Sequence, residues 1–255
     1  MKFRPCIDIH NGKVKQIVGG SLKDAGDQAR ENFVSRQDGA FYASLYKEKG
    51  LKGGHIILLN SADSQYFEDT RKQAFLALEA YPGGLQLGGG VNPENAGVYL
   101  DAGASHVIVT SYVFKDGSIS WENLDKMVKA VGREHLVLDL SCRKKEDAYY
   151  VVTDRWQKFT QQQVTLELME KLGSFCDEFL VHAVDVEGKA NGIEVPLASL
   201  LGKYDGRPVT YAGGVGSMED IQILKEAADG KLDVTVGSAL DLFGGKIPFE
   251  MLVSL

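Results

Sequence analysis

Two aspartates interrupt apolar runs, and together they could act as an acid and a base. Asp8 lies in "CIDIH" near the start of the chain, and Asp139 lies in "VLDLS" near its middle. Burying an unpaired carboxylate in a core costs free energy or forces protonation. Two carboxylates can instead serve as general acid and general base when their surroundings separate their pKa values. We therefore predict that both are catalytic, although a helix cap or a structural salt bridge is the alternative for either residue alone.

Glycine clusters in two similar segments predict two phosphate sites. One cluster precedes a helix start at Asn92-Pro93, and the other precedes Ser217. Glycines allow backbone amides to approach a ligand, and a helix N-terminus favours a phosphate dianion. Tight turns are the alternative for one cluster alone, but the repetition favours a long substrate with a phosphate at each end. The expected phosphate ligands are Gly89, Gly90 and Ser111 in the first segment, and Gly213, Gly214, Gly237 and Ser238 in the second.

Three further side chains are candidates because of where they lie along the chain. His182 lies in the run "LVHAVD", and its imidazole titrates near neutral pH, so we expect it to help protonate or polarise a substrate. Trp156 lies in a long segment after "VLDLS" and could stack on a planar heterocycle or belong to the core. Arg143, in the same segment, could bind a phosphate or face solvent. The other four histidines are expected to be structural or solvated.

Charge and absent motifs argue against several other classes of function. The net charge is −7, which disfavours nucleic-acid and membrane-surface partners. The three cysteines share no metal-ligand spacing, and neither G-x-S-x-G nor H-E-x-x-H occurs. We therefore expect no metal site and no nucleophilic mechanism. The chain shows no apolar leader and no stretch of membrane-spanning length, so a cytoplasmic protein with reduced cysteines is expected.

Short β-rich runs alternate with amphipathic helical segments along all 255 residues. Eight runs are each short enough for a parallel strand covered on both faces. This alternation predicts an α/β fold, one (β/α)₈ barrel domain spanning residues 1–255. An open doubly wound sheet is the alternative, disfavoured because no G-x-G-x-x-G follows the first run. The expected strands are 3–9, 55–60, 85–89, 106–111, 136–141, 178–185, 208–214 and 233–238, and the expected helices include 68–81, 92–103, 120–132, 165–173 and 217–230.

The barrel prediction places the candidate residues at one mouth, because active sites of such barrels lie at the carboxyl ends of the strands. Two long loops, about residues 17–38 and 141–163, would project from that end, and "AYYVVT" in the second predicts an additional hairpin strand. The segment "LGGGVNPENAGVYLDAGASHVIVTSYVF" recurs as "AGGVGSMEDIQILKEAADGKLDVTVGSALDLF". This repeat indicates two similar half-barrels, with Asp8 and Asp139 facing each other across the mouth.

The motifs taken together resemble a known family. The chain contains "RPCIDIHNGKVKQIVGG", "LGGGVN", "VLDLSCR", "AGGVGS" and "VTVGSALDLFGG". They are similar to the phosphoribosylformimino-aminoimidazole carboxamide ribotide isomerases of histidine biosynthesis, and closest to the eukaryotic branch of that family. The likeness covers essentially the whole chain and implies a monomeric (β/α)₈ barrel without a cofactor. The implied reaction is an Amadori rearrangement of an aminoaldose to an aminoketose, which opens one ribose ring of a bis-phosphorylated small molecule.

The resemblance assigns roles to four of the candidates. Asp139 matches the family's general acid at the ribose ring oxygen, and Asp8 matches the base that removes the C2′ proton. Trp156 matches a loop tryptophan that packs on the substrate's imidazole, and His182 occupies the position of a supporting threonine in bacterial members. The chain departs from bacterial members at Val186 and Glu187, which replace the arginine and aspartate of "RDGT", at Asn92, where an arginine is usual, and at Thr110-Ser111.

Three other functions are the alternatives. The cyclase subunit of imidazole glycerol phosphate synthase shares the half-barrel repeat and both aspartates, but it needs a lysine near the position of Gln16, which has Lys15 beside it here. The isomerase of tryptophan biosynthesis performs the same chemistry on a substrate with a single phosphate, which the doubled glycine motif disfavours. A catalytically inactive phosphosugar-binding barrel would be expected to lack one of the two strand-end acids.

Overall fold

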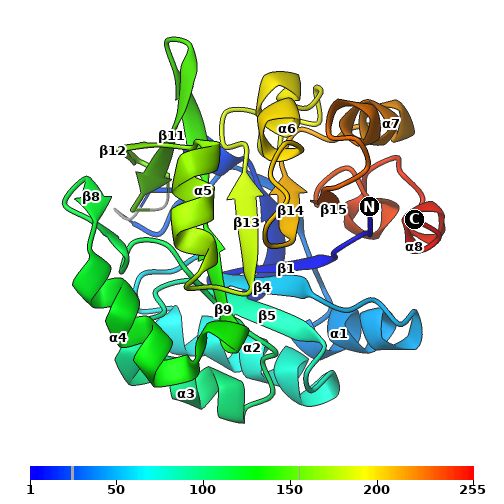
Figure 1. The fold of residues 1–255 in the computed structure, drawn as a ribbon. Coiled ribbons are helices and arrows are strands. Elements are labelled where there is room, and N and C mark those ends of the chain that lie inside the picture. The colour runs from blue at the N-terminus through cyan, green and yellow to red at the C-terminus, as the bar shows by residue number, and fades with distance from the viewer. Residues whose placement is uncertain (24–25, 155) are drawn as a thin grey trace.

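Eight parallel strands follow one another in chain order around a barrel in the computed structural model, which describes residues 1–23, 26–154 and 156–255 (Figure 1). The first and last strands are joined by a parallel bridge between Phe3 and Val234, which closes the sheet on itself. Closure leaves the barrel without a free edge. The barrel strands are β1 (Cys6–His10), β4 (Gly54–Leu58), β5 (Leu85–Gly88), β6 (Val107–Val109), β9 (Leu136–Asp139), β13 (Glu178–His182), β14 (Val209–Ala212) and β15 (Asp233–Thr235).

A helix follows each barrel strand and packs outside it, so the predicted (β/α)₈ fold is confirmed. The five helices expected from the sequence are all present. Asn92 caps α3 in a reciprocal capping box with Asn95, and Pro93 occupies the first turn. The helices are α1 (Gly39–Glu48), α2 (Phe67–Ala80), α3 (Pro93–Asp101), α4 (Trp121–Val131), α5 (Leu166–Gly173), α6 (Val195–Leu201), α7 (Met218–Ala227) and α8 (Phe249–Val253).

The two long loops contain short strands of their own. The segment 17–38 includes the 3₁₀ turn Gly19–Ser21 and β3 (Glu31–Val34), which pairs with β2 (Lys13–Ile17). The expected hairpin in 141–163 is confirmed as part of a three-stranded sheet of β10 (Cys142–Lys145), β11 (Ala148–Thr153) and β12 (Lys158–Gln163). A smaller hairpin joins β7 (Phe114–Lys115) to β8 (Ser118–Ile119), and further 3₁₀ turns span Arg133–His135 and Asp241–Phe243.

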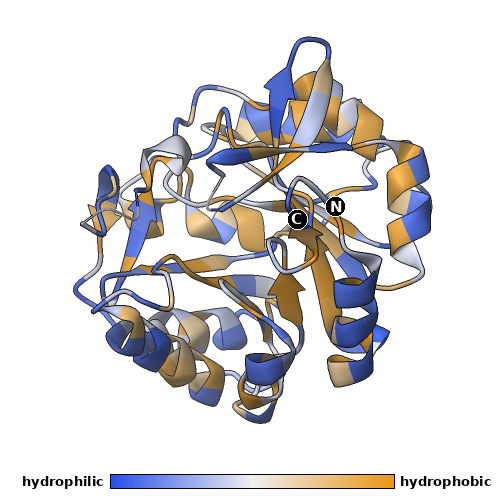
Figure 2. Ribbon diagram, turned by 90° about the vertical axis from the view of Figure 1, so that its left-hand side faces the viewer, coloured by the Kyte–Doolittle hydropathy of each residue, from blue (hydrophilic) through white to orange (hydrophobic). Residues whose placement is uncertain are grey.

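The apolar core lies mainly between the barrel and its helices. Figure 2 shows hydrophobic residues concentrated on the strands, whereas the helices alternate hydrophobic and hydrophilic residues. Inside the barrel, a separate small apolar cluster is formed by Ile108, Val137 and Leu180, with Ile57 packed against it. The remaining interior positions are free to carry polar groups, which gather at the two ends of the barrel. Among the described helices, none is long and apolar enough to cross a membrane.

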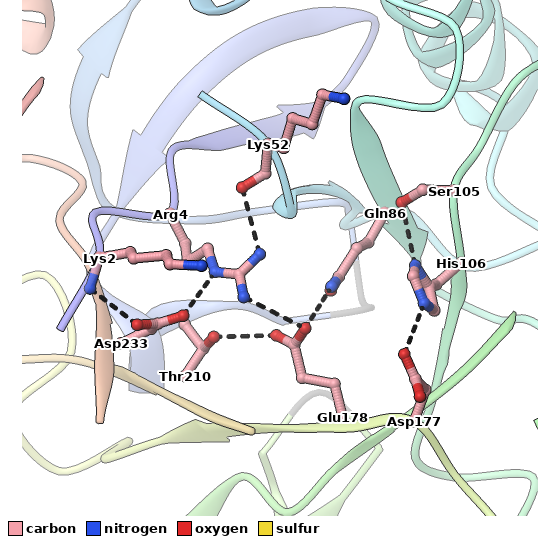
Figure 3. Close-up of polar contacts among 10 residues, drawn as sticks. All are labelled: Lys2, Arg4, Lys52, Gln86, Ser105, His106, Asp177, Glu178, Thr210 and Asp233. Carbon is pink, nitrogen blue, oxygen red and sulfur yellow. Dashed lines mark hydrogen bonds and ion pairs between the residues drawn. The ribbon is translucent and has the colours of Figure 1, made fainter. Parts of the chain in front are cut away.

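One polar cluster closes the barrel at the amino ends of its strands (Figure 3). Glu178 accepts hydrogen bonds from Gln86 at 3.1 Å and from Thr210 at 2.9 Å, and its carboxylate lies 3.7 Å from the Arg4 guanidinium. Arg4 also donates to Asp233 at 2.8 Å. Burial raises the pKa of Glu178, and the charge of Arg4 opposes that shift. Active sites of such barrels lie at the opposite, carboxyl end of the strands, so this cluster is placed to stabilise the fold.

Candidate active site

The opposite end of the barrel contains two cavities that meet at His182, the last residue of β13. The larger cavity, of about 360 Å³, is lined by Asp139 and Trp156 among others. The smaller cavity, of about 30 Å³, is lined by Asp8 and Glu187 among others. His182 lines both cavities. The structure therefore brings the two predicted aspartates to one mouth and places a histidine between them.

Asp139 ends β9 as expected, and its carboxylate is held by three donors. The backbone N–H and the hydroxyl of Ser141 donate to Oδ1 at 2.7 and 2.6 Å, and the hydroxyl of Thr110 donates to Oδ2 at 3.1 Å. Burial raises the pKa of this carboxyl, but the nearby imidazole of His182 and the hydrogen bonds from Ser141 outweigh burial and lower the pKa overall. Asp139 is therefore ionised at neutral pH.

Asp8 lies two residues before the end of β1, because the strand continues to His10. The side-chain amide of Gln16 donates to its Oδ2 at 3.2 Å. Burial, and then the negative charge of Glu187, raise the pKa of Asp8 to about 7, while His182 and Gln16 oppose the rise. A carboxyl that exchanges its proton near neutral pH is suited to general acid–base catalysis. The two aspartates therefore have opposite pKa shifts, which is the condition for separate roles.

His182 is enclosed by aromatic rings and carboxylates. Its ring centroid lies 5.4 Å from that of Trp156 on one side and 5.7 Å from that of His55 on another. Its Nδ1 lies 3.1 Å from the hydroxyl oxygen of Ser141 and 3.8 Å from Oδ1 of Asp139. Burial lowers the pKa of His182, but Asp139 and the other carboxylates outweigh burial and raise it. The carboxylates around His182 therefore favour the charged form of the imidazole at the mouth.

The predicted phosphate residues divide between the two cavities. Gly89, Gly90 and Ser111 line the larger cavity, whereas Gly213, Gly214, Gly237 and Ser238 line the smaller one. The two glycine pairs share an unusual backbone, because φ is +106° and +67° at Gly89 and Gly90, and +115° and +80° at Gly213 and Gly214. Each pair precedes a helix that begins with a capping box, α3 in one half and α7 in the other. The backbone therefore repeats as the sequence does.

Arg143 is the one predicted site residue that the structure places apart. Its Nε donates to Asp185 at 2.8 Å, and its guanidinium lies over the ring of Phe159. It lines neither cavity at the mouth. Trp156, by contrast, lies in the larger cavity with a φ of +67°, a strained backbone for a residue with a side chain. The structure therefore holds Arg143 in an ion pair with Asp185, outside both cavities.

Four residues of the site were not predicted to be functional. Ser141 and Thr110 hold Asp139, Gln16 holds Asp8, and Glu187 adds a negative charge beside Asp8. Gln16 and Glu187 entered the sequence analysis only as points of comparison with related families. The one sequence signal for a functional role of Ser141 is its position two residues after Asp139. The electrostatic effect of Glu187 on Asp8 depends on the loop between β13 and α6, and the sequence near Glu187 gives no sign of it.

A closed (β/α)₈ barrel with ionisable side chains and glycine-lined cavities at its mouth defines an enzyme of the barrel class that acts on a small molecule. The chain belongs to the histidine biosynthesis protein family, whose model matches residues 2–248. A relative from Medicago truncatula is 54% identical over 259 residues, covering 100% of this chain and 81% of the relative. Relatives from Neurospora crassa and Saccharomyces cerevisiae are 44% and 40% identical, each covering 96% of this chain and 94% of the relative. All three are named as phosphoribosyl-substituted imidazole-4-carboxamide isomerases.

Proposed function

We propose that this protein is the isomerase of histidine biosynthesis that its relatives are named as, and that it acts by an Amadori rearrangement. The observation that carries the proposal is the similarity itself, which extends over at least 96% of the chain at 40–54% identity in the three relatives. The site supports it independently. Two carboxyls with opposite pKa shifts lie at one mouth between two glycine-lined cavities, as a bis-phosphorylated substrate with a reacting centre in its middle would require.

The reaction divides into an acid step and a base step. On the acid side, Asp139 and His182 act together to supply a proton to the ribose ring oxygen. The bond from that oxygen to C1′ breaks in the same step, which leaves a Schiff base. On the base side, Asp8 removes the proton at C2′, and the resulting enol tautomerises to the ketone. We assign Asp8 to the base because its pKa of about 7 leaves an ionised fraction ready to accept a proton at neutral pH.

The substrate would extend from one cavity to the other. We propose that Gly89, Gly90 and Ser111 bind one phosphate, with Trp156 stacked on the imidazole between the phosphates. The second phosphate would bind at Gly213, Gly214, Gly237 and Ser238.

Several properties of the whole molecule belong to the same proposal. We propose that residues 1–255 act as one domain, as a monomer, without a cofactor and in the cytoplasm. The Medicago truncatula relative is named as chloroplastic, so a plastid is the alternative location. Fractionation of the source cells and size-exclusion chromatography with light scattering would decide location and oligomeric state.

A coupled assay with two substrates tests the activity. We expect turnover of the bis-phosphorylated imidazole-4-carboxamide aminoaldose and no measurable turnover of phosphoribosylanthranilate, the single-phosphate substrate of the tryptophan pathway. The product is measured by its consumption in the next enzymatic step. A parallel reaction with ammonia but without the coupling enzyme detects any cyclase activity of this chain. Absence of turnover with the bis-phosphorylated substrate would refute the proposal, and equal turnover of both would refute the claimed substrate preference.

A pair of glycine variants tests the first phosphate site. Gly90 and Gly83 have similar φ values, +67° and +71°, and at each an added Cβ meets nothing within 4 Å. Alanine should therefore cost each variant a similar ~1–2 kcal/mol of stability from backbone strain. Only Gly90 lines the larger cavity. We expect Gly90→Ala to raise KM by at least ~10-fold, equivalent to ~1.4 kcal/mol of binding, and Gly83→Ala to leave KM unchanged.

The comparison is made by steady-state kinetics, with thermal melting of both variants as the check on strain. Equal KM values in the two variants would contradict the assignment of Gly90 to phosphate binding.

A further inference from the structure

Ser141 lies between the two acid-side residues and contacts both of them. It is fully buried just after β9. Its backbone N–H and its hydroxyl both donate to Oδ1 of Asp139, at 2.7 and 2.6 Å, and its hydroxyl oxygen lies 3.1 Å from Nδ1 of His182. Asp139 and His182 themselves are 3.8 Å apart, beyond hydrogen-bond distance. Ser141 therefore makes the hydrogen-bonded connection between them.

The direction of each hydrogen bond follows from the donors available. An ionised carboxylate only accepts, so the single hydroxyl proton of Ser141 must point to Asp139. The hydroxyl oxygen can then only accept from His182, which requires a proton on Nδ1. The other ring nitrogen, Nε2, makes no hydrogen bond to any residue that the structure describes, and His182 lines both cavities. Nε2 is the nitrogen left for a substrate.

We propose that Ser141 is a positioning residue that fixes His182 with Nδ1 protonated, so that Nε2–H of His182 is the group that protonates the substrate. This inference rests on the proposed isomerase function. In the step, the Nε2–H bond breaks as the new O–H bond forms at the ribose ring oxygen. The bond from C1′ to that oxygen breaks at the same time, and its electron pair goes to the oxygen. His182 is left neutral with Nδ1–H still bound to Ser141, and Asp139 stays ionised throughout.

The surrounding charges favour this arrangement. Asp139 from β9, Glu187 from the loop after β13 and Asp8 from β1 all stabilise the charged imidazole. His55 from β4 packs against the ring and is neutral, because burial and the charge of His182 lower its pKa to about 3. Asp139, whose pKa is lowered, has no proton to give at neutral pH, whereas the raised pKa of His182 favours the protonated form of its ring.

Nuclear magnetic resonance of ¹⁵N-labelled histidine side chains tests the positioning role without substrate. In the unmodified protein we expect the neutral form of His182 to carry its proton on Nδ1. In Ser141→Ala the neutral form should become a mixture of the two tautomers, and the pKa of His182 should fall by about one pH unit. The matched control is Thr110→Val, which removes the 3.1 Å hydrogen bond to the other oxygen of the same carboxylate and should leave the tautomer unchanged.

Kinetics of a double-variant cycle test the catalytic consequence. We expect Ser141→Ala to lower kcat by at least ~10-fold with little change in KM, and to move the alkaline limb of the pH profile down by about one unit. His182→Gln should lower kcat by ~100-fold, and the double variant should be no slower than His182→Gln, because Ser141 acts only through His182.

Three results would overturn the inference. One is a double variant whose loss of kcat is the product of the losses in the two single variants. A second is an unchanged tautomer of His182 in Ser141→Ala. The third is an unchanged pKa of His182 in Ser141→Ala, which would mean that Asp139 and His182 close their gap to a direct ion pair. Because the spectra need no substrate, failure of this inference is distinguishable from absence of isomerase activity in the unmodified protein. Melting temperatures confirm that each variant folds.

Discussion

Asp8→Asn is expected to lower kcat by at least ~100-fold, the lower end of the contribution of a general base. Asparagine keeps the size of the side chain and can still meet the amide of Gln16, but it cannot accept the C2′ proton. Steady-state kinetics at pH 8 measure the loss. Turnover within a few-fold of the unmodified protein would remove Asp8 from the base step.

The pH dependence of the unmodified protein provides a second measurement on Asp8. The base must be ionised, so kcat/KM should fall as pH falls through the pKa of about 7. The matched variant is Glu187→Gln, which removes the negative charge that helps to raise this pKa. It should move the acidic limb to lower pH while keeping Asp8 in place. An acidic limb that does not move would show that another group controls it.

Stability should change in the direction opposite to activity for Asp8→Asn. The pKa of Asp8 is raised from 3.8 to about 7 in the folded protein, so the fold disfavours the ionised form. The unfolded chain therefore releases this proton first, and stability decreases as pH rises from about 4 to about 7. Removing the buried charge should raise the melting temperature at pH 8. A variant that melts higher and has lost activity cannot owe the loss to misfolding.

Asp139→Asn is the second variant with a large expected effect, a loss of at least ~100-fold in kcat. The carboxylate accepts three hydrogen bonds and raises the pKa of His182, so a neutral amide should lower that pKa and reduce the protonated fraction of His182. Relative to the unmodified protein at the same pH, the loss should be smaller at pH 6 than at pH 8, because His182 regains its proton at the lower pH while protonation of Asp8 slows both proteins. A loss that is the same at both pH values would contradict this mechanism.

The stability of Asp139→Asn should fall, in contrast to that of Asp8→Asn. The pKa of Asp139 is lowered in the fold, so its ionised form contributes stability above its unfolded pKa, and that contribution is lost as pH falls through the folded pKa. Replacing the ionised acceptor of the Ser141 and Thr110 hydrogen bonds by a neutral amide with a single oxygen should cost ~1–3 kcal/mol at pH 8. Chemical denaturation at pH 8 measures it. Equal stability changes in the two aspartate variants would show that their environments do not differ as described.

The barrel itself could be predicted because its signals are local and repeated. Each strand is an apolar run a few residues long, and caps such as Asn92 lie within three residues of their partners. The similar segments around Gly89 and Gly213 indicated the same backbone twice, and both pairs have positive φ. The strand β3 (Glu31–Val34) within residues 17–38 was not predicted, because it is mostly exposed and so has no apolar run. Its pairing with β2 depends on how the intervening chain folds back.

By itself, the sequence determined the alternation of strands and helices, the repeat and the two aspartates, because hydrophobic period and residue type are properties of neighbouring positions. Only the tertiary structure decided the electrostatic state of the site. Glu187 lies far along the chain from Asp8 yet raises its pKa, and Ser141 joins Asp139 to a histidine on another strand. A pKa depends on burial and on charges within a few ångströms, and those distances exist only after the barrel has closed.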